Sequence, residues 1–153
     1  MSPRRKLSIA GVCLAGGVGV LVGLGGYTFT YAEGTSYLSN DPNACVNCHI
    51  MRETFDAWQK SPHHANATCN DCHVPVDVVG KYTSKAVHGW NHSKAFTLNN
   101  FHEPIQISQY SKDIVENNCR RCHTALVAEL AVADHASGDC VHCHSGVGHG
   151  PRR

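Results

Sequence analysis

The 153-residue sequence has little from which to build an ordinary hydrophobic core. Aromatic residues make up 7% of the chain, and many of the apolar residues lie in one N-terminal block. No later stretch alternates apolar and polar residues well enough to predict a β-strand. The formal net charge of +1 gives no reason to expect a nucleic acid as partner. We therefore expect one domain with an appended segment, held together by more than its own side chains.

Cysteine and histidine are the abundant exceptions, with 9 and 12 residues. An odd number of cysteines does not suit a framework made only of disulfides. The ninth, Cys13, lies in the apolar block, where we interpret it as a small apolar residue of a helix. A lipoprotein cysteine is the alternative, although Val12 precedes it where a small residue is expected. The other eight form pairs with two residues between the cysteines: Cys45/Cys48, Cys69/Cys72, Cys119/Cys122 and Cys140/Cys143.

The N-terminal block predicts a membrane anchor. No charged residue occurs from Leu7 to about Phe29, and roughly 20 apolar residues suffice to span a bilayer. The basic cluster that precedes it, residues 4–6, should stay in the cytoplasm. A cleaved signal peptide is the alternative, but this run is long for such a segment and no convincing cleavage site follows. We predict a cytoplasmic basic segment (1–6), a transmembrane anchor (7–30) and a domain outside the cytoplasm (31–153).

The anchor is rich in glycine. Gly19 and Gly23 form a G-x-x-x-G pair, which allows another helix to approach closely and predicts possible self-association. The alternative is that glycine is simply common in membrane helices. Tyr27, Phe29 and Tyr31 suit the outer membrane interface, where amphipathic rings settle.

The remainder of the chain predicts short helices and loops. The segments 52–60 and 124–135 have the composition and spacing of short helices, and 99–108 that of a loop. Proline, glycine and asparagine interrupt the chain between them. The predicted fold is mainly α with many loops, in which the chain wraps around something other than its own side chains.

Each cysteine pair is followed at once by histidine, in "CVNCH", "CNDCH", "CRRCH" and "CVHCH". C-x-x-C-H is the attachment signature of c-type haem, in which two thiols bond to the haem and the histidine can reach the iron. Zinc also uses cysteine pairs but does not require a histidine directly after each pair. The chance that a histidine follows all four pairs by coincidence is about one in 10⁴ to 10⁵. We predict four covalently bound haem c groups. The motif histidines are His49, His73, His123 and His144.

Haem is attached outside the cytoplasmic membrane in bacteria, which agrees with the predicted topology. We therefore predict a single-pass protein of a bacterial cytoplasmic membrane, with a small periplasmic tetrahaem cytochrome domain. Further ligands would come from the remaining histidines. His64, five residues before Cys69, and His149, near the end of the chain, are the best placed. The other candidates are His63, His88, His92, His102, His135 and His142.

An N-terminal anchor followed by four C-x-x-C-H motifs resembles the NapC/NirT family of membrane-bound quinol dehydrogenases. "HANATCNDCH" and the C-x-x-C-H-x-M of "CVNCHIM" are the most specific parts of the likeness. The resemblance implies that menaquinol is oxidised near the first haem and that protons leave on the outer side. Electrons then pass to a multihaem cytochrome c nitrite reductase catalytic subunit, which reduces nitrite to ammonium in anaerobic respiration.

The resemblance also implies a set of iron ligands. Met51 would bind the first iron in place of His49, and thioether ligation generally raises a haem potential. From the motif alone His49 is the ligand, so the two remain alternatives. A lysine of the catalytic partner can serve the second haem. His73, His123 and His144 would be proximal ligands, while His149 would serve the third haem and His64 the fourth.

Two further residues are implied as catalytic. Lys85 matches a lysine near the quinol site of the family. His92 falls where some members carry an aspartate beside the first haem, which leaves open whether it binds iron or handles a proton. Two alternatives to the main hypothesis remain: a family member that serves another periplasmic reductase, and an anchored tetrahaem electron carrier without quinol chemistry.

Overall fold

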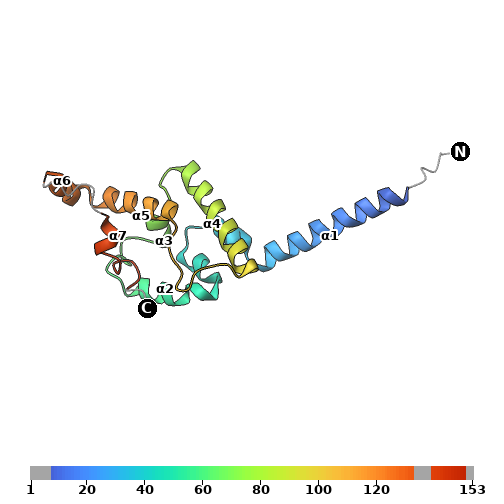
Figure 1. Cartoon of the computed structure of the whole chain (residues 1–153), viewed down its shortest axis with the longest axis horizontal. Coiled ribbons are helices and arrows are strands. Elements are labelled where there is room, and N and C mark those ends of the chain that lie inside the picture. Colours follow the sequence, from blue (N-terminus) through green and yellow to red (C-terminus); the bar gives the residue numbers. More distant parts are fainter. Residues whose placement is uncertain (1–7, 133–138, 151–153) are drawn as a thin grey trace. The chain divides into compact units, whose positions relative to one another are not determined.

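The computed structural model of the chain describes residues 8–132 and 139–150, and the side chains of 129–132 are not part of that description (Figure 1). Two compact units make up the chain, Met1–Ser36 and Tyr37–Arg153. The predicted cytoplasmic segment, His135 and the last residues of the helix predicted over 124–135 lie outside the described residues.

The first unit contains one long apolar helix, α1 (Ile9–Tyr31). Ser8 caps its start, with its Oγ accepting a hydrogen bond from the Gly11 N–H at 3.1 Å. Its 23 residues extend over about 35 Å, which exceeds the roughly 30 Å hydrocarbon core of a bilayer. No residue of α1 is buried within the chain. Among the described residues, α1 is the one helix long and apolar enough to cross a membrane.

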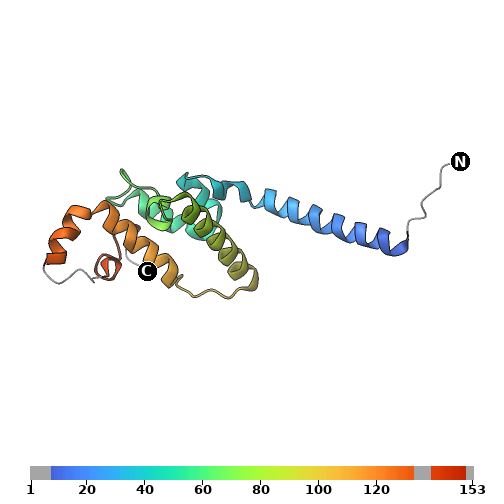
Figure 2. The same cartoon turned by 90° about the horizontal axis from the view of Figure 1, so that it is seen from above.

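The second unit is helical, and no strand occurs among the residues that the structure describes, so the predicted fold class is confirmed. Three short 3₁₀-helices (η) follow α1, and the remaining described elements are α-helices (Figures 1 and 2). After α1 the elements are η1 (Gly34–Leu38), η2 (Pro42–Asn47), η3 (His49–Met51), α2 (Arg52–Gln59), α3 (Cys69–His73), α4 (Val78–Leu98), α5 (Gln109–Cys122), α6 (Thr124–Val132) and α7 (Cys140–Cys143).

Helix α4 is the main departure from the short segments that the sequence predicts, because it runs for 21 residues. Asp77 caps its start, with Oδ1 accepting from the Gly80 N–H at 2.7 Å. Asn99 ends it in the left-handed conformation, at φ 52°, which asparagine tolerates better than most residues. The following segment, 99–108, is a loop as predicted. The Ser84 hydroxyl, fully buried, is hydrogen-bonded to that of Tyr110 in α5 at 2.7 Å.

Helix α5 is the element on which the other short helices assemble. Both α3 and α7 contact it (Figures 1 and 2). Asn118 of α5 is 7% exposed, and its Nδ2 donates to the carbonyls of Cys72 at 3.0 Å and Val74 at 2.9 Å. Those carbonyls lie at the end of α3, where a helix has no partners of its own for them. Asn118 therefore fixes α3 against α5.

The hydrophobic core of the second unit is very small. Of the described residues, only Val74 and Ile114 are buried apolar side chains. Each contributes roughly 1.5–3 kcal/mol when fully buried, whereas ordering each residue costs about 1–2 kcal/mol in backbone entropy. Two such side chains cannot hold a domain of this size. The small core agrees with the prediction that the chain packs around something other than its own side chains.

Replacing Asn118 with alanine removes both bonds to the end of α3 and leaves two buried carbonyls without a partner. We expect the free energy of unfolding to fall by about 1–3 kcal/mol, measured by chemical denaturation of the haem-loaded protein in detergent. Asn91→Ala, at an exposed site of α4, is the matched control. Equal denaturation midpoints for the two variants would contradict this role for Asn118.

Candidate functional site

Three of the four cysteine motifs lie on single helical turns. The second motif (69–73) forms α3, the third (119–123) ends α5, and the fourth (140–144) forms α7. Residues three apart share one face of a helix, so the two thiols of each pair are neighbours. His123 and His144 are the C-cap residues of α5 and α7. Two adjacent thiols followed by a histidine at the helix end fit covalent attachment of one haem per motif.

The first motif (45–49) has a different backbone. Helix η2 ends at Asn47, Cys48 is extended with φ −85° and ψ 116°, and His49 begins a separate turn, η3. The His49 side chain is exposed, whereas that of Met51 is half-buried. The histidine of this motif is therefore not presented at a helix end as those of the other three motifs are.

Two pairs of histidine rings face each other at similar distances. The ring centres of His73 and His149 are 6.3 Å apart with planes at 12°, and those of His63 and His123 are 6.1 Å apart at 78°. An imidazole nitrogen binds a transition metal at about 2.0–2.1 Å, and the ring centre lies roughly 1.1 Å behind it. Two rings on opposite sides of one iron therefore have centres about 6.3 Å apart. Both pairs fit this spacing.

The surroundings of two of these rings also suit metal binding. His63 Nδ1 lies 3.2 Å from the carbonyl oxygen of Val147. A carbonyl only accepts, so Nδ1 is the donor in this contact and Nε2 is the nitrogen that would bind a metal, as in many metal-binding histidines. Burial, with His149 and His88 nearby, lowers the pKa of His73 to about 4. That ring is therefore neutral at pH 7.

These pairs differ from those that the resemblance implies. His149 faces His73 of the second motif. The resemblance, in contrast, links His149 to the third haem and gives the second haem no distal ligand within the chain. His63, not His64, faces His123. The ring of His64 packs edge-on against Trp58, with centres 4.6 Å apart. The Trp58 Nε1 donates to the Ala67 carbonyl at 3.1 Å and fixes the turn that carries both histidines.

The first and second motifs lie side by side. The Cys45 thiol is hydrogen-bonded to that of Cys69. This bond and the positive charge of Lys85 lower the pKa of Cys45 to about 7, although burial and the charge of Asp41 oppose the shift. The described residues contain no group of three or more Cys, His, Asp or Glu side chains that could hold a metal ion. A structural zinc ion needs four such ligands, so the zinc alternative has no support in this part of the chain.

Lys85 is 8% exposed and lies beside the first motif. Its Nζ donates to the Ser39 carbonyl at 2.5 Å and to Asn40 Oδ1 at 3.4 Å. Burial and the charge of Lys81 lower the pKa of Lys85, and the neighbouring Cys45 opposes the shift. A buried ammonium group with a lowered pKa releases a proton more readily than an exposed lysine does.

His92 lies one turn after His88 on α4, with ring centres 6.0 Å apart and planes at 12°. Burial lowers the pKa of both rings, and His92 adds to the effect at His88. His88 Nε2 is hydrogen-bonded to Ser111 Oγ of α5 at 3.0 Å. Each ring is therefore mostly neutral at pH 7 and able to accept a proton.

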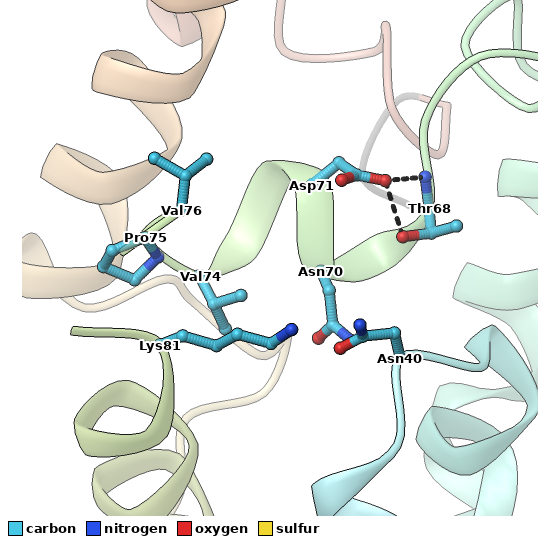
Figure 3. A pocket seen from close by; sticks show the side chains of 8 residues that line it. All are labelled: Asn40, Thr68, Asn70, Asp71, Val74, Pro75, Val76 and Lys81. Carbon is cyan, nitrogen blue, oxygen red and sulfur yellow. Dashed lines mark hydrogen bonds between the residues drawn. The ribbon is translucent and has the colours of Figure 1, made fainter. Parts of the chain in front are cut away.

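A cavity of about 300 Å³ lies against α3 (Figure 3). Asn70 and Asp71 of α3 line it together with Val74, the extended residue after the helix, whereas Cys69, Cys72 and His73 are not among the lining residues. Asp71 closes one end of α3 by accepting hydrogen bonds from the Thr68 N–H at 2.8 Å and hydroxyl at 2.7 Å. The cavity is thus separate from the thiols and ring of the second motif. Its other lining residues are Asn40, Thr68, Pro75, Val76 and Lys81.

Comparison with known proteins finds one matching family model and relatives with similar descriptions. The model of the NapC/NirT cytochrome c family, N-terminal region, matches residues 3–152. The chain is 40% identical over 146 residues to the cytochrome c-type protein NrfH of Wolinella succinogenes, covering 88% of this chain and 82% of the relative. It is 35% identical over 120 residues to the cytochrome c nitrite reductase subunit NrfH of Nitratidesulfovibrio vulgaris, covering 78% and 74%.

A solved structure has the same fold. It is a chain of the cytochrome c nitrite reductase NrfHA complex bound to the HQNO inhibitor, with a TM-score of 0.65 and 29% identity, covering 93% of this chain and 92% of that one. The family model spans nearly the whole sequence, and the motif geometry fits c-type haem. This chain belongs to the NapC/NirT cytochrome c family.

Proposed function

We propose that this protein is a tetrahaem quinol dehydrogenase that oxidises menaquinol at the membrane and passes the electrons to a periplasmic nitrite reductase. The observation that carries the proposal is the buried Lys85, which lies beside the first C-x-x-C-H motif. Helix α1 is also long and apolar enough to span a bilayer. A proton-handling group next to an electron-accepting site is what quinol oxidation requires, because each quinol yields two electrons and two protons.

Four haem c groups would be held by the eight paired cysteines. Haem supplies one-electron acceptors whose potentials depend on the axial ligands and on burial. His73 with His149, and His123 with His63, are proposed as ligand pairs because of their ring spacings. His144 is proposed as the proximal ligand of the fourth haem, and the exposed His64 remains a candidate for its other side.

Met51 is proposed as the iron ligand of the first haem in preference to His49. The half-buried thioether, the exposed His49 and the extended Cys48 between two turns support this choice. A methionine ligand makes a haem easier to reduce than two histidines do. The first haem would then accept electrons from quinol, and the others would carry them onward.

Lys85 and His92 are proposed as the groups that hold and move the protons of the quinol. Lys85 Nζ is anchored by two acceptors, Ser39 O and Asn40 Oδ1, so one of its three N–H bonds is left for a quinol oxygen. The lowered pKa of His92 leaves its ring unprotonated at pH 7 and ready to accept a proton. Both side chains belong to α4, which holds them on one rigid element.

The partner is proposed to be the catalytic subunit of a multihaem nitrite reductase, with the soluble unit in the periplasm. The two NrfH relatives and the NrfHA structure support this partner. A different reductase is the second candidate, since the chain is also 30% identical over 171 residues to NapC of Escherichia coli, covering 94% of this chain and 83% of the relative. Self-association through α1 is also proposed, and the small residues Gly19 and Gly23 support it.

Replacing Met51 with leucine should change the absorption spectrum of one haem and slow menaquinol oxidation, because leucine offers no sulfur lone pair. The measurement is an oxidised and reduced spectrum of the purified haem-loaded protein. His49→Ala is the control and should leave the spectrum unchanged. An unchanged spectrum in Met51→Leu together with an altered one in His49→Ala would assign the iron to His49.

Replacing Lys85 with methionine should slow reduction by a menaquinol analogue by about a hundredfold, the lower range for loss of a group that transfers protons. Stopped-flow absorbance in detergent measures the rate. Lys94→Met, an exposed lysine on the same helix, is the control. Reduction by dithionite, which needs no quinol site, should be the same in all three proteins. Wild-type quinol rates in Lys85→Met would contradict the proposal, and no quinol reduction of the wild type would favour a simple electron carrier.

A further inference from the structure

One carboxylate of α5, that of Glu116, binds the start of the fourth motif. Glu116 Oε2 accepts a hydrogen bond from the Cys140 N–H at 3.0 Å, and Oε1 accepts one from the Val141 N–H at 2.8 Å. Both N–H groups belong to the first turn of α7, where a helix provides no acceptors of its own. Hydrogen bonds to an ionised group are stronger than neutral ones. Glu116 therefore binds two N–H donors of this turn at once.

A second contact joins the same two helices. Lys112, one turn before Glu116 on α5, forms an ion pair with Asp139 at the start of α7. Asp139 Oδ1 also accepts from the His142 N–H at 3.1 Å, as a helix cap does. The two side chains of the ion pair remain 29% and 35% exposed, and such pairs contribute little. Glu116 is the stronger of the two connections.

The same helix carries the third motif. Glu116 lies three residues before Cys119, so it is on the face of α5 that also presents this cysteine. One side chain thus fixes the attachment segment of the fourth haem next to that of the third. Because electron transfer slows steeply with distance, the separation of these two segments decides how fast electrons pass between them.

The carboxylate is also a negative charge beside the fourth attachment site. A hydrogen bond to Glu116 raises the pKa of the Cys140 thiol, with burial and the charge of Glu116 adding to the effect. The charge therefore acts on the sulfur that the haem would bond. A nearby negative charge stabilises the oxidised iron and lowers its reduction potential.

We propose that Glu116 is a positioning residue for the fourth haem, which holds the fourth attachment segment on α5 beside the third and lowers the potential of that haem. This inference rests on the proposed presence of four haems. It does not depend on quinol chemistry or on the identity of the reductase.

The test is a redox titration of the purified full-length protein in detergent, followed by visible absorbance, with haem content from the intact mass. In Glu116→Gln we expect four haems, with the potential of the fourth shifted upward most, because Glu116 bonds the fourth motif directly, and the potentials of the first and second haems unchanged. Glu116→Asp keeps the charge but shortens the side chain. The midpoint potential of the fourth haem in this variant should therefore lie closer to the wild-type value than to that of Glu116→Gln. Asp113→Asn removes one negative charge from α5 at an exposed site that bonds only Gln109 among the described contacts, and should leave all four potentials unchanged.

Each outcome has a separate meaning. Loss of one haem in Glu116→Gln but not in Asp113→Asn would also support the positioning role. Four unchanged potentials in Glu116→Gln, or an equal shift in Asp113→Asn, would overturn it. A wild-type protein without four haems would instead overturn the proposed function.

Discussion

The contacts that helix α5 makes with two other motif helices are the constraint on which the second unit depends. Asn118 donates to two carbonyls at the end of α3, and Glu116 accepts from two N–H groups at the start of α7. The N–H groups at the start of a helix and the carbonyls at its end have no hydrogen-bond partners within the helix. Since only Val74 and Ile114 form an apolar core among the described residues, polar contacts decide where the second, third and fourth motifs lie.

The first motif does not share this arrangement, and its different local structure suits a different role from that of the other three. Extended Cys48 interrupts its helical backbone, the Met51 side chain that follows it is half-buried, and Lys85 lies buried beside it. The other motifs are regular helical turns, two of which meet histidine rings supplied from elsewhere in the chain. Substrate chemistry at the first site and electron transfer through the others would follow from these two local structures.

The sequence was sufficient to predict a long apolar helix near the N-terminus and the lack of strands among the described residues, because each depends on local composition or periodicity. It did not reveal helix α4, since Gly80 and Gly89 interrupt the helical pattern, whereas the caps at Asp77 and Asn99 determine its length. Nor could it show that the ring of His63, not that of His64, faces His123. The position of the His63 ring depends on a contact with Val147, 84 residues away, which no local sequence pattern indicates.

The most direct test of the ring pairs is electron paramagnetic resonance of the oxidised, haem-loaded protein. Planes at 12° for His73 and His149 and at 78° for His63 and His123 predict two different low-spin signals. The first should be rhombic, as for nearly parallel imidazoles, and the second strongly anisotropic, as for nearly perpendicular ones. His63→Ala should abolish the second signal alone, and His64→Ala should leave it intact. If His64→Ala abolished the second signal and His63→Ala left it unchanged, the arrangement described for the third motif would be contradicted.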